Sequence, residues 1–220
     1  AYYPVDWAEQ LQYFLETIVK KPVILIVQGA LLPCAVFLIT LQQKSNLISG
    51  LILSGPPQLE LMQKASSPVQ QKLKWNLFNS PIGQVFYPYA RRRKFLESFS
   101  KKQLFANGNQ VDEEWLDTLE KGAKNPQSKY AVFSFLAGFW RQDFSQAIAQ
   151  IHQPTLVLVG NQASTISKTK RIETPEQRIN TYLKYLPQAK GNQISGRNVL
   201  PYESTVEFVK AVSKFLLTIN

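Results

Sequence analysis

The side chains that most often perform acid–base or nucleophilic chemistry are scarce in this sequence. His152 is its only histidine, and Cys34 is its only cysteine. Ser164 and Ser195 have no base beside them in the sequence, and a serine hydroxyl without an adjacent base is a poor nucleophile. We interpret Cys34 as a small buried thiol. These residues therefore do not favour nucleophilic catalysis.

Metal and phosphate binding have no better support. One histidine, one cysteine and scattered carboxylates give no ligand set with the spacing of a metal site. The sequence has no glycine-rich loop of the kind that cradles phosphates. We therefore expect no metal and no cofactor. A single cysteine also excludes an internal disulfide, so we expect an intracellular, reducing compartment.

Strand-like and helical patterns alternate at both ends of the chain. Apolar runs predict strands at residues 23–27, 47–53 and 155–159, and a short strand is predicted at residues 191–194. Apolar spacing predicts helices at residues 6–19, 32–43, 175–186 and 204–217. Asp6 is the expected N-cap of the first helix, and Val206, Val209, Val212, Phe215 and Leu216 form the expected apolar face of the last. A strand, a helix and a second strand with short links predict a parallel α/β unit.

This arrangement places His152 away from the edge of the sheet where ligands bind. Ligands of parallel α/β sheets bind at the carboxyl ends of the strands. His152 precedes the strand at residues 155–159. About eight residues at roughly 3.3 Å each separate it from the other end, a span of about 25 Å. We therefore expect a structural role for His152.

The middle of the chain has helical patterns and no convincing strand. Helices are predicted near residues 69–78, 91–105, 112–121 and 128–140. We therefore expect three parts: a first core part at residues 1–57, a helical cap at 58–150 and a second core part at 151–220. Within the cap, Phe133, Phe135, Phe139 and Trp140 are expected to pack against the sheet, or else to line an apolar pocket beneath the cap.

Separated segments of the chain resemble those of α/β-hydrolases. Residues 7–11 and 22–27, with the turn and helix that follow, resemble the region around that family's nucleophile. Residues 153–160 resemble the strand before the catalytic acid, and residues 196–203 resemble the histidine loop, G-x-G-H-x-P-x-x-E. The resemblance covers nearly the whole chain. It extends to the cyanobacterial and plastid esterase-like, pheophytinase-type branch, which implies a cyanobacterial cytoplasm or plastid stroma, peripheral to the thylakoid membrane.

The matched positions lack the family's catalytic triad. The nucleophile motif G-x-S-x-G matches residues 28–32, which places Ala30 at the serine. The acid position matches Ala163, and the histidine position matches Val199. None of the three side chains can act as a nucleophile, an acid or a base. The resemblance therefore implies an α/β-hydrolase fold, a mostly parallel sheet with a helical cap, without the family's acyl-transfer chemistry.

The family's strands before the nucleophile have no counterpart in this sequence. The strand at residues 23–27 is then expected to be an exposed apolar edge, although its composition is typical of a strand buried on both faces. Either a preceding segment of a longer chain or a partner chain would cover this edge. We favour the preceding segment.

The chain is strongly basic, with a net charge of +10 and a pI near 9.6. Such a charge favours acidic partners. The densest cationic patch is formed by Arg91, Arg92, Arg93, Lys94, Lys101 and Lys102. With the neighbouring aromatic residues it fits an anionic membrane surface or an acidic protein, and a solvated helix face is the plainer interpretation. Nucleic acid is not favoured because no recognition motif accompanies the charge.

Three functions stay open from the sequence. The first is a non-catalytic α/β-hydrolase-like protein, a binding or scaffold subunit of a photosynthetic or membrane-associated complex, with a protein partner or a hydrophobic ligand such as a lipid or pigment tail under the cap. The second is a hydrolase or esterase with unorthodox or residual activity. The third is a subunit of a larger assembly that is joined through the edge strand and the basic patch.

Overall fold

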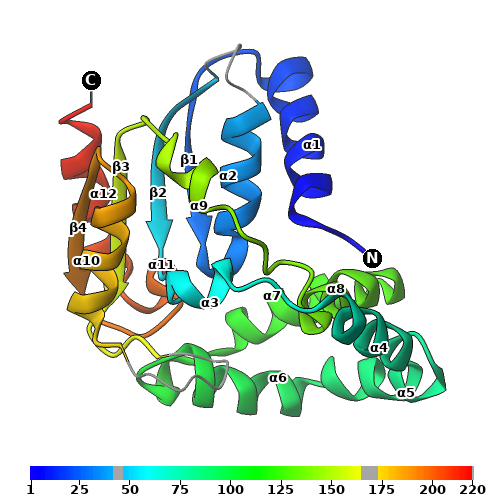
Figure 1. Cartoon of the computed structure of the whole chain (residues 1–220). Coiled ribbons are helices and arrows are strands. Elements are labelled where there is room, and N and C mark those ends of the chain that lie inside the picture. The colour runs from blue at the N-terminus through cyan, green and yellow to red at the C-terminus, as the bar shows by residue number, and fades with distance from the viewer. Residues whose placement is uncertain (42–46, 165–172, 220) are drawn as a thin grey trace.

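The computed structural model describes residues 1–41, 47–164 and 173–219. Its fold is of the α/β class, as the sequence predicted. Four parallel strands follow the order β1-β2-β3-β4. They are β1 (Val23–Gln28), β2 (Ile48–Ser54), β3 (Thr155–Gly160) and β4 (Ala189–Ile194). The register pairs Leu25 with Leu51, Leu51 with Thr155 and Thr155 with Ala189. All four carboxyl ends therefore lie at one edge of the sheet, which faces the cap (Figure 1).

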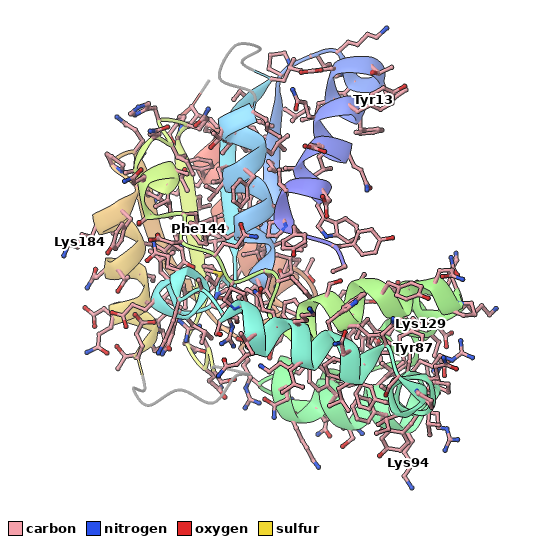
Figure 2. The ribbon with its side chains drawn as sticks, turned by 45° about the vertical axis from the view of Figure 1, so that its right-hand side comes forward. Tyr13, Tyr87, Lys94, Lys129, Phe144 and Lys184 are labelled. Carbon is pink, nitrogen blue, oxygen red and sulfur yellow. The ribbon has the colours of Figure 1, made fainter. Side chains whose placement is uncertain are left out.

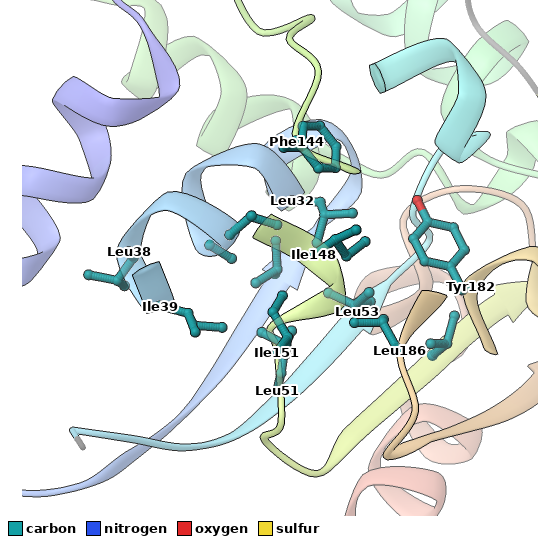
Figure 3. Close-up of a cluster of buried hydrophobic side chains, with 14 of the residues drawn as sticks. Leu32, Leu38, Ile39, Leu51, Leu53, Phe144, Ile148, Ile151, Tyr182 and Leu186 are labelled. Atoms are coloured by element: carbon teal, nitrogen blue, oxygen red, sulfur yellow. The ribbon is translucent and has the colours of Figure 1, made fainter. Parts of the chain in front are cut away.

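Helices cover both faces of the sheet. The elements on the first face are α1 (Pro4–Phe14), α2 (Leu32–Leu41), α9 (Ser145–Ala149) and α10 (Pro175–Tyr185), and those on the second are α11 (Leu200–Glu203) and α12 (Thr205–Leu216). Side chains of β2 alternate between the faces. Leu51 and Leu53 join the larger core cluster (Figure 3), and Ile52 joins the smaller one on the other face. The smaller cluster also contains Phe208 and Phe215 of α12.

The first helix begins two residues earlier than predicted. Tyr3 is its N-cap, and Pro4 occupies the first helical position, where a missing N–H costs nothing. Asp6 is therefore not the N-cap, but its carboxylate accepts a hydrogen bond of 2.7 Å from the Tyr3 N–H. The helix continues as a π-helical turn, Leu15–Val19, and ends at Lys20, whose φ of 54° is left-handed.

The segment between β2 and β3 is helical within the described residues, as predicted. Its larger helices are α3 (Leu59–Gln63), α4 (Pro68–Phe78), α5 (Pro81–Ala90), α6 (Arg93–Phe99), α7 (Glu113–Ala123) and α8 (Lys129–Ala137). Short turns lie at Ser100–Leu104, Gly108–Gln110 and Pro126–Ser128. The sequence patterns did not predict α3, α5 or α9. Two prolines obscure the pattern of α5, but Pro81 fits its first position, and the Ser80 hydroxyl accepts a hydrogen bond from the Ile82 N–H.

Two elements are more exposed on one face than their composition predicted. β1 is an edge strand, as the resemblance implied, and Ile26 is 52% exposed because no helix within the described residues covers its face of the strand. In α12, Val206 and Val209 are exposed, and Phe208 takes the buried position. Phe208 and Phe215 lie two turns apart on the side of the helix that faces the sheet. Because the helix has 3.6 residues per turn, valines at every third position do not all lie on that side.

The packing of β2 makes a stability prediction. Replacing fully buried Leu53 by alanine should lower the free energy of unfolding by about 2–5 kcal/mol, because it removes apolar contacts and leaves a cavity. Urea denaturation measures this change. Leu217→Ala, at an exposed position, is the control and should change stability by less than about 0.5 kcal/mol. Equal effects of the two substitutions would contradict the assignment of the core.

Candidate functional site

A cavity of about 280 Å³ lies where the strand ends meet the cap. Its wall is mainly apolar and comes from the cap, with Leu61, Phe99, Leu104, Phe135 and Trp140. The turn after β1, the turn after β2 and the loop before α11 close its other side. Segments that are far apart in the sequence therefore enclose one small space at the carboxyl edge of the sheet.

Two of the three positions matched to the triad line this cavity, namely Ala30 and Val199. Ala163 follows β3 and packs against the larger core cluster, and its neighbour Ser164 lines the cavity. The side chains of Ala30, Ala163 and Val199 include no acid, base or nucleophile.

The turn after β1 has its positive φ one residue before Ala30. Gly29 has a φ of 59° and begins a short 3₁₀ turn, Gly29–Leu31, which leads into α2. The nucleophile of an α/β-hydrolase occupies the strained residue of this sharp turn. Gly29 and Ala30 both belong to this turn, and neither has a nucleophilic side chain.

Gln28 connects the two strand ends to the loop before α11. Its side-chain Nε2 donates a hydrogen bond of 2.6 Å to the backbone oxygen of Asn198. Its Oε1 accepts one of 2.7 Å from the buried Ser54 hydroxyl. Beside them, Gly55 has a φ of 55°, and a Cβ there would lie 2.5 Å from the same Asn198 oxygen. The close approach requires glycine at this position.

Asn198 extends this network to the cap and to Ser164. Its side-chain amide donates to the Gln103 backbone oxygen at 2.8 Å and to the Ser164 hydroxyl oxygen at 3.4 Å. The group beside the Ser164 hydroxyl is thus a hydrogen-bond donor, which cannot accept its proton. No imidazole or carboxylate lines the cavity in the part of the chain that the structure describes. A serine in this environment is not activated for attack.

The two remaining candidates for chemistry do not join the site. His152 is exposed in the loop before β3, at the amino end of that strand, where the sequence placed it. Cys34 lies in α2, and burial raises the pKa of its thiol to about 11. A thiol with so high a pKa is protonated near neutral pH and is a weak nucleophile.

The turn after β2 is fixed by two buried residues of α10 that the sequence analysis missed. The Tyr182 hydroxyl donates a 2.8 Å hydrogen bond to the backbone oxygen of Pro57, which lines the cavity. The Arg178 guanidinium donates to the Pro56 oxygen and pairs with Glu173 at 3.3 Å. Burial raises the pKa of Tyr182 well above its ordinary value, so the phenol stays a donor.

The predicted aromatic group divides between packing and the cavity. Phe133 and Phe139 are buried within the cap, as packing would require. Phe135 and Trp140 line the cavity and stack on each other, with ring centroids 5.0 Å apart and planes 9° from parallel. The cavity lining is therefore confirmed for Phe135 and Trp140, whereas Phe133 packs against Phe78 and Tyr87 within the cap rather than against the sheet.

Much of the predicted cationic patch is used inside the cap. Arg93 of α6 pairs with Asp117 at 2.7 Å, with Glu120 at 2.8 Å and with Glu113, all on α7. Hydrogen bonds to these carboxylates, with Asp117 first, raise the pKa of the Arg93 guanidinium. This ion-pair network joins α6 to α7, so Arg93 has a structural role.

The other cations of the predicted patch differ in their partners and in their exposure. Arg91 donates to the backbone oxygens of Ala123 and Lys124, each at 3.4 Å. Lys101 pairs with Glu97 at 2.5 Å, and this hydrogen bond lowers the pKa of the Glu97 carboxyl. Within the predicted patch, the exposed cations without a carboxylate partner among the described residues are Arg92, Lys94 and Lys102. The patch is therefore smaller than its sequence suggested.

The described residues form neither a metal-binding cluster nor a helix that could span a membrane. No group of three or more His, Cys, Asp or Glu side chains in residues 1–41, 47–164 and 173–219 is placed to hold a metal ion. No helix in those ranges combines the length and the apolar character needed to cross a bilayer.

The sequence matches no protein-family model and no curated protein. Solved structures of α/β-hydrolase-fold proteins resemble it instead. A thermophilic esterase from Thermogutta terrifontis has a TM-score of 0.68 at 16% identity, over 100% of this chain and 74% of the esterase. An enol-lactonase from Burkholderia xenovorans has a TM-score of 0.68 at 13% identity, over 98% and 74%. A bromoperoxidase from Bacillus anthracis has 0.66 at 17%, over 95% and 72%. At such identities the likeness shows a shared fold.

Gln28 should matter for stability more than its position at a strand end suggests. Gln28→Leu should lower the free energy of unfolding by about 1–3 kcal/mol, because the Ser54 hydroxyl and the Asn198 oxygen lose their partner. Thermal and urea denaturation measure the loss. Ser54→Ala should cost less in the Gln28→Leu background than alone, and strictly additive effects would show that the two side chains do not interact.

Cys34 should react slowly with thiol reagents. Since its pKa is about 11 against an ordinary 9.0, about a hundredfold fewer thiols are ionised at pH 7. The rate of alkylation by iodoacetamide should keep rising with pH up to about 11. A rate that levels off below pH 9 would contradict the burial of this thiol.

Proposed function

We propose that this α/β-hydrolase-fold protein binds a small apolar ligand beneath its cap and does not hydrolyse it. The observation that supports the proposal most strongly is that Ala30, Val199 and the neighbour of Ala163 all open on the apolar cavity. The fold keeps an enclosed space at the place where α/β sheets bind ligands. The groups that would convert a bound ligand are replaced by small or apolar side chains.

The size and walls of the cavity indicate the class of ligand. A volume of about 280 Å³ lies just below the range of small-molecule sites, roughly 300–1,000 Å³. This volume fits a short acyl chain or a single aromatic ring better than a pigment tail. The stacked pair Phe135 and Trp140 offers a flat face to such a ligand, and Leu61, Phe99 and Leu104 surround the remainder.

A polar end of the ligand would lie near the turn after β1. Gly29 and Ala30 lie at the amino end of α2, where unpaired N–H groups and the helix dipole favour a carbonyl or carboxylate. The Ser164 hydroxyl accepts from Asn198 and keeps its own proton to donate. A short-chain carboxylate therefore matches both the walls and the polar end of the cavity.

Hydrolysis by an unorthodox route is the second candidate. The structural neighbours favour it, since they include an esterase and an enol-lactonase. Among the described residues that line the cavity, Ser164 carries the only hydroxyl, so it would be the nucleophile of such a route. Its contact with the Asn198 amide argues against that role because no described residue of the lining is a base that could take its proton.

Ligand binding can be tested with octanoate by isothermal titration calorimetry. The protein should bind it saturably at one site, with a negative heat-capacity change that reflects burial of apolar surface. Val199→Trp should fill the cavity and weaken binding by about tenfold or more. Val206→Trp, at an exposed position of α12, is the matched control and should bind as the unchanged protein does. Equal binding by both variants would place the ligand elsewhere.

Hydrolysis can be tested with p-nitrophenyl butyrate. The proposal expects no turnover above that of a mock purification, and no difference between the unchanged protein and Ser164→Ala. Turnover that Ser164→Ala abolishes, in a variant with unchanged thermal stability, would establish the hydrolase and overturn the proposal.

A further inference from the structure

A different surface, on the outer side of the cap, combines exposed apolar side chains with uncompensated positive charge. Residues 61–96 contain no aspartate or glutamate. The same segment contains seven basic residues, Lys64, Lys72, Lys74, Arg91, Arg92, Arg93 and Lys94, against a net charge of +10 for the whole chain. Most of the excess charge of the protein therefore lies in one stretch that spans α4 and α5.

Two rows of apolar side chains on these helices face away from the cap interior. Val69, Leu73 and Leu77 of α4 are spaced by four residues, and Ile82, Val85 and Tyr89 of α5 by three and four, so each set lies along one side of its helix. All six side chains are at least half exposed. An exposed apolar surface of this kind marks an interaction site.

The opposite sides of the same helices are packed. On α4, the Trp75 ring lies beside that of Tyr130, and the Phe78 ring stacks on that of Phe133 at 5.3 Å. Tyr130 and Phe133 both belong to α8. On α5, buried Tyr87 contacts Phe133 at 6.0 Å. The helices are thus held in the cap by one face, and the outward rows are not needed for its packing.

The two helices adjoin closely, so their rows belong to one corner of the molecule. Gly83 of α5 packs on the end of α4, where a Cβ would lie 1.6 Å from the Phe78 backbone oxygen. Phe78 and Phe86 also lie 6.1 Å apart. In Figures 1 and 2, α4 and α5 form the outer corner of the cap, with labelled Lys94 and Lys129 on the same side and Lys184 on the far side of the sheet.

Cations border the apolar rows without carboxylate partners. Lys72, Lys74, Arg92 and Lys94 are exposed, and none of them forms an ion pair within the described residues. Arg92 lies over the Tyr89 ring at 5.9 Å and shares a shallow depression with Pro81, Ile82 and Val85. Aliphatic side chains, a tyrosine and a rim of cations are the composition that binds the interface of an anionic bilayer.

We propose that the corner formed by α4 and α5 docks the protein on an anionic lipid bilayer, with the two apolar rows in the headgroup–acyl boundary and the lysines and arginines on lipid phosphates. A protein with an acidic rim would need a contact surface that spans the corner, whereas a fluid bilayer adapts to it. The inference is independent of what the cavity holds.

Vesicle co-sedimentation tests the proposal. The full chain should bind vesicles of phosphatidylcholine with 30% phosphatidylglycerol at least about tenfold more strongly than vesicles of phosphatidylcholine alone. About 0.5 M salt should weaken binding to the anionic vesicles because it screens the cations from the lipid phosphates. Equal binding to both compositions, or none, would overturn the proposal.

A pair of matched variants locates the surface. Ile82→Glu/Val85→Glu should reduce binding to the anionic vesicles by about tenfold or more, because it places two carboxylates among apolar contacts. Val206→Glu/Val209→Glu makes the same change in charge on α12, at positions 83% and 54% exposed against 66% and 73% for the first pair. The control should keep most of the binding.

Two further outcomes would reject the lipid surface. Equal losses in both double variants would show a general effect of net charge. A dimer of the unchanged protein that Ile82→Glu/Val85→Glu converts to a monomer, without vesicle binding by either form, would assign the rows to contact between copies of the chain. Circular dichroism and thermal denaturation confirm that each variant is folded.

Discussion

Four strands paired in parallel leave their carboxyl ends at one edge of the sheet, and the segments that leave this edge meet beneath the cap. The turn after β1, the turn after β2 and the loop before α11 are drawn together by the hydrogen bonds of Gln28 to Asn198 and Ser54. Tyr182 holds the second turn from the side of α10. The position and size of the cavity follow from this convergence, as does the meeting of residues that are far apart in the sequence.

The same hydrogen bonds occupy the polar side chains that line the cavity. Acyl transfer needs a nucleophile beside an oriented base. Here the side-chain amides of Gln28 and Asn198 bond to the backbone and to hydroxyls, and apolar groups complete the lining. The interactions that hold the strand ends and the cap together thus leave a partly open, mainly apolar space. Such a space favours binding, and the structural neighbours supply the fold on which this interpretation rests.

Periodicity and turn chemistry predicted the order of strands and helices because those signals are local. Apolar runs identified β1, β2 and β3, and two of the matched triad positions, Ala30 and Val199, do line one cavity. The pairing of Arg93 with α7 was beyond local signals because its partners lie 20 or more residues away. Val206 and Phe208 show the same limit, since both suit an apolar face and only the position of the sheet decides which is buried. Gln28 gave a weak signal, a polar residue that ends an apolar strand.

The central claim is that the cavity beneath the cap holds a ligand without converting it. Two-dimensional NMR during a titration with octanoate tests it most directly. The account predicts saturable shifts of the Trp140 indole N–H and the Asn198 side-chain amide, with the resonances of Val206 unchanged. Methyl octanoate, added in place of the acid, should produce chemical-shift changes at the same sites and should stay intact over hours. Absence of shifts at Trp140 and Asn198, or release of methanol by the protein, would contradict it.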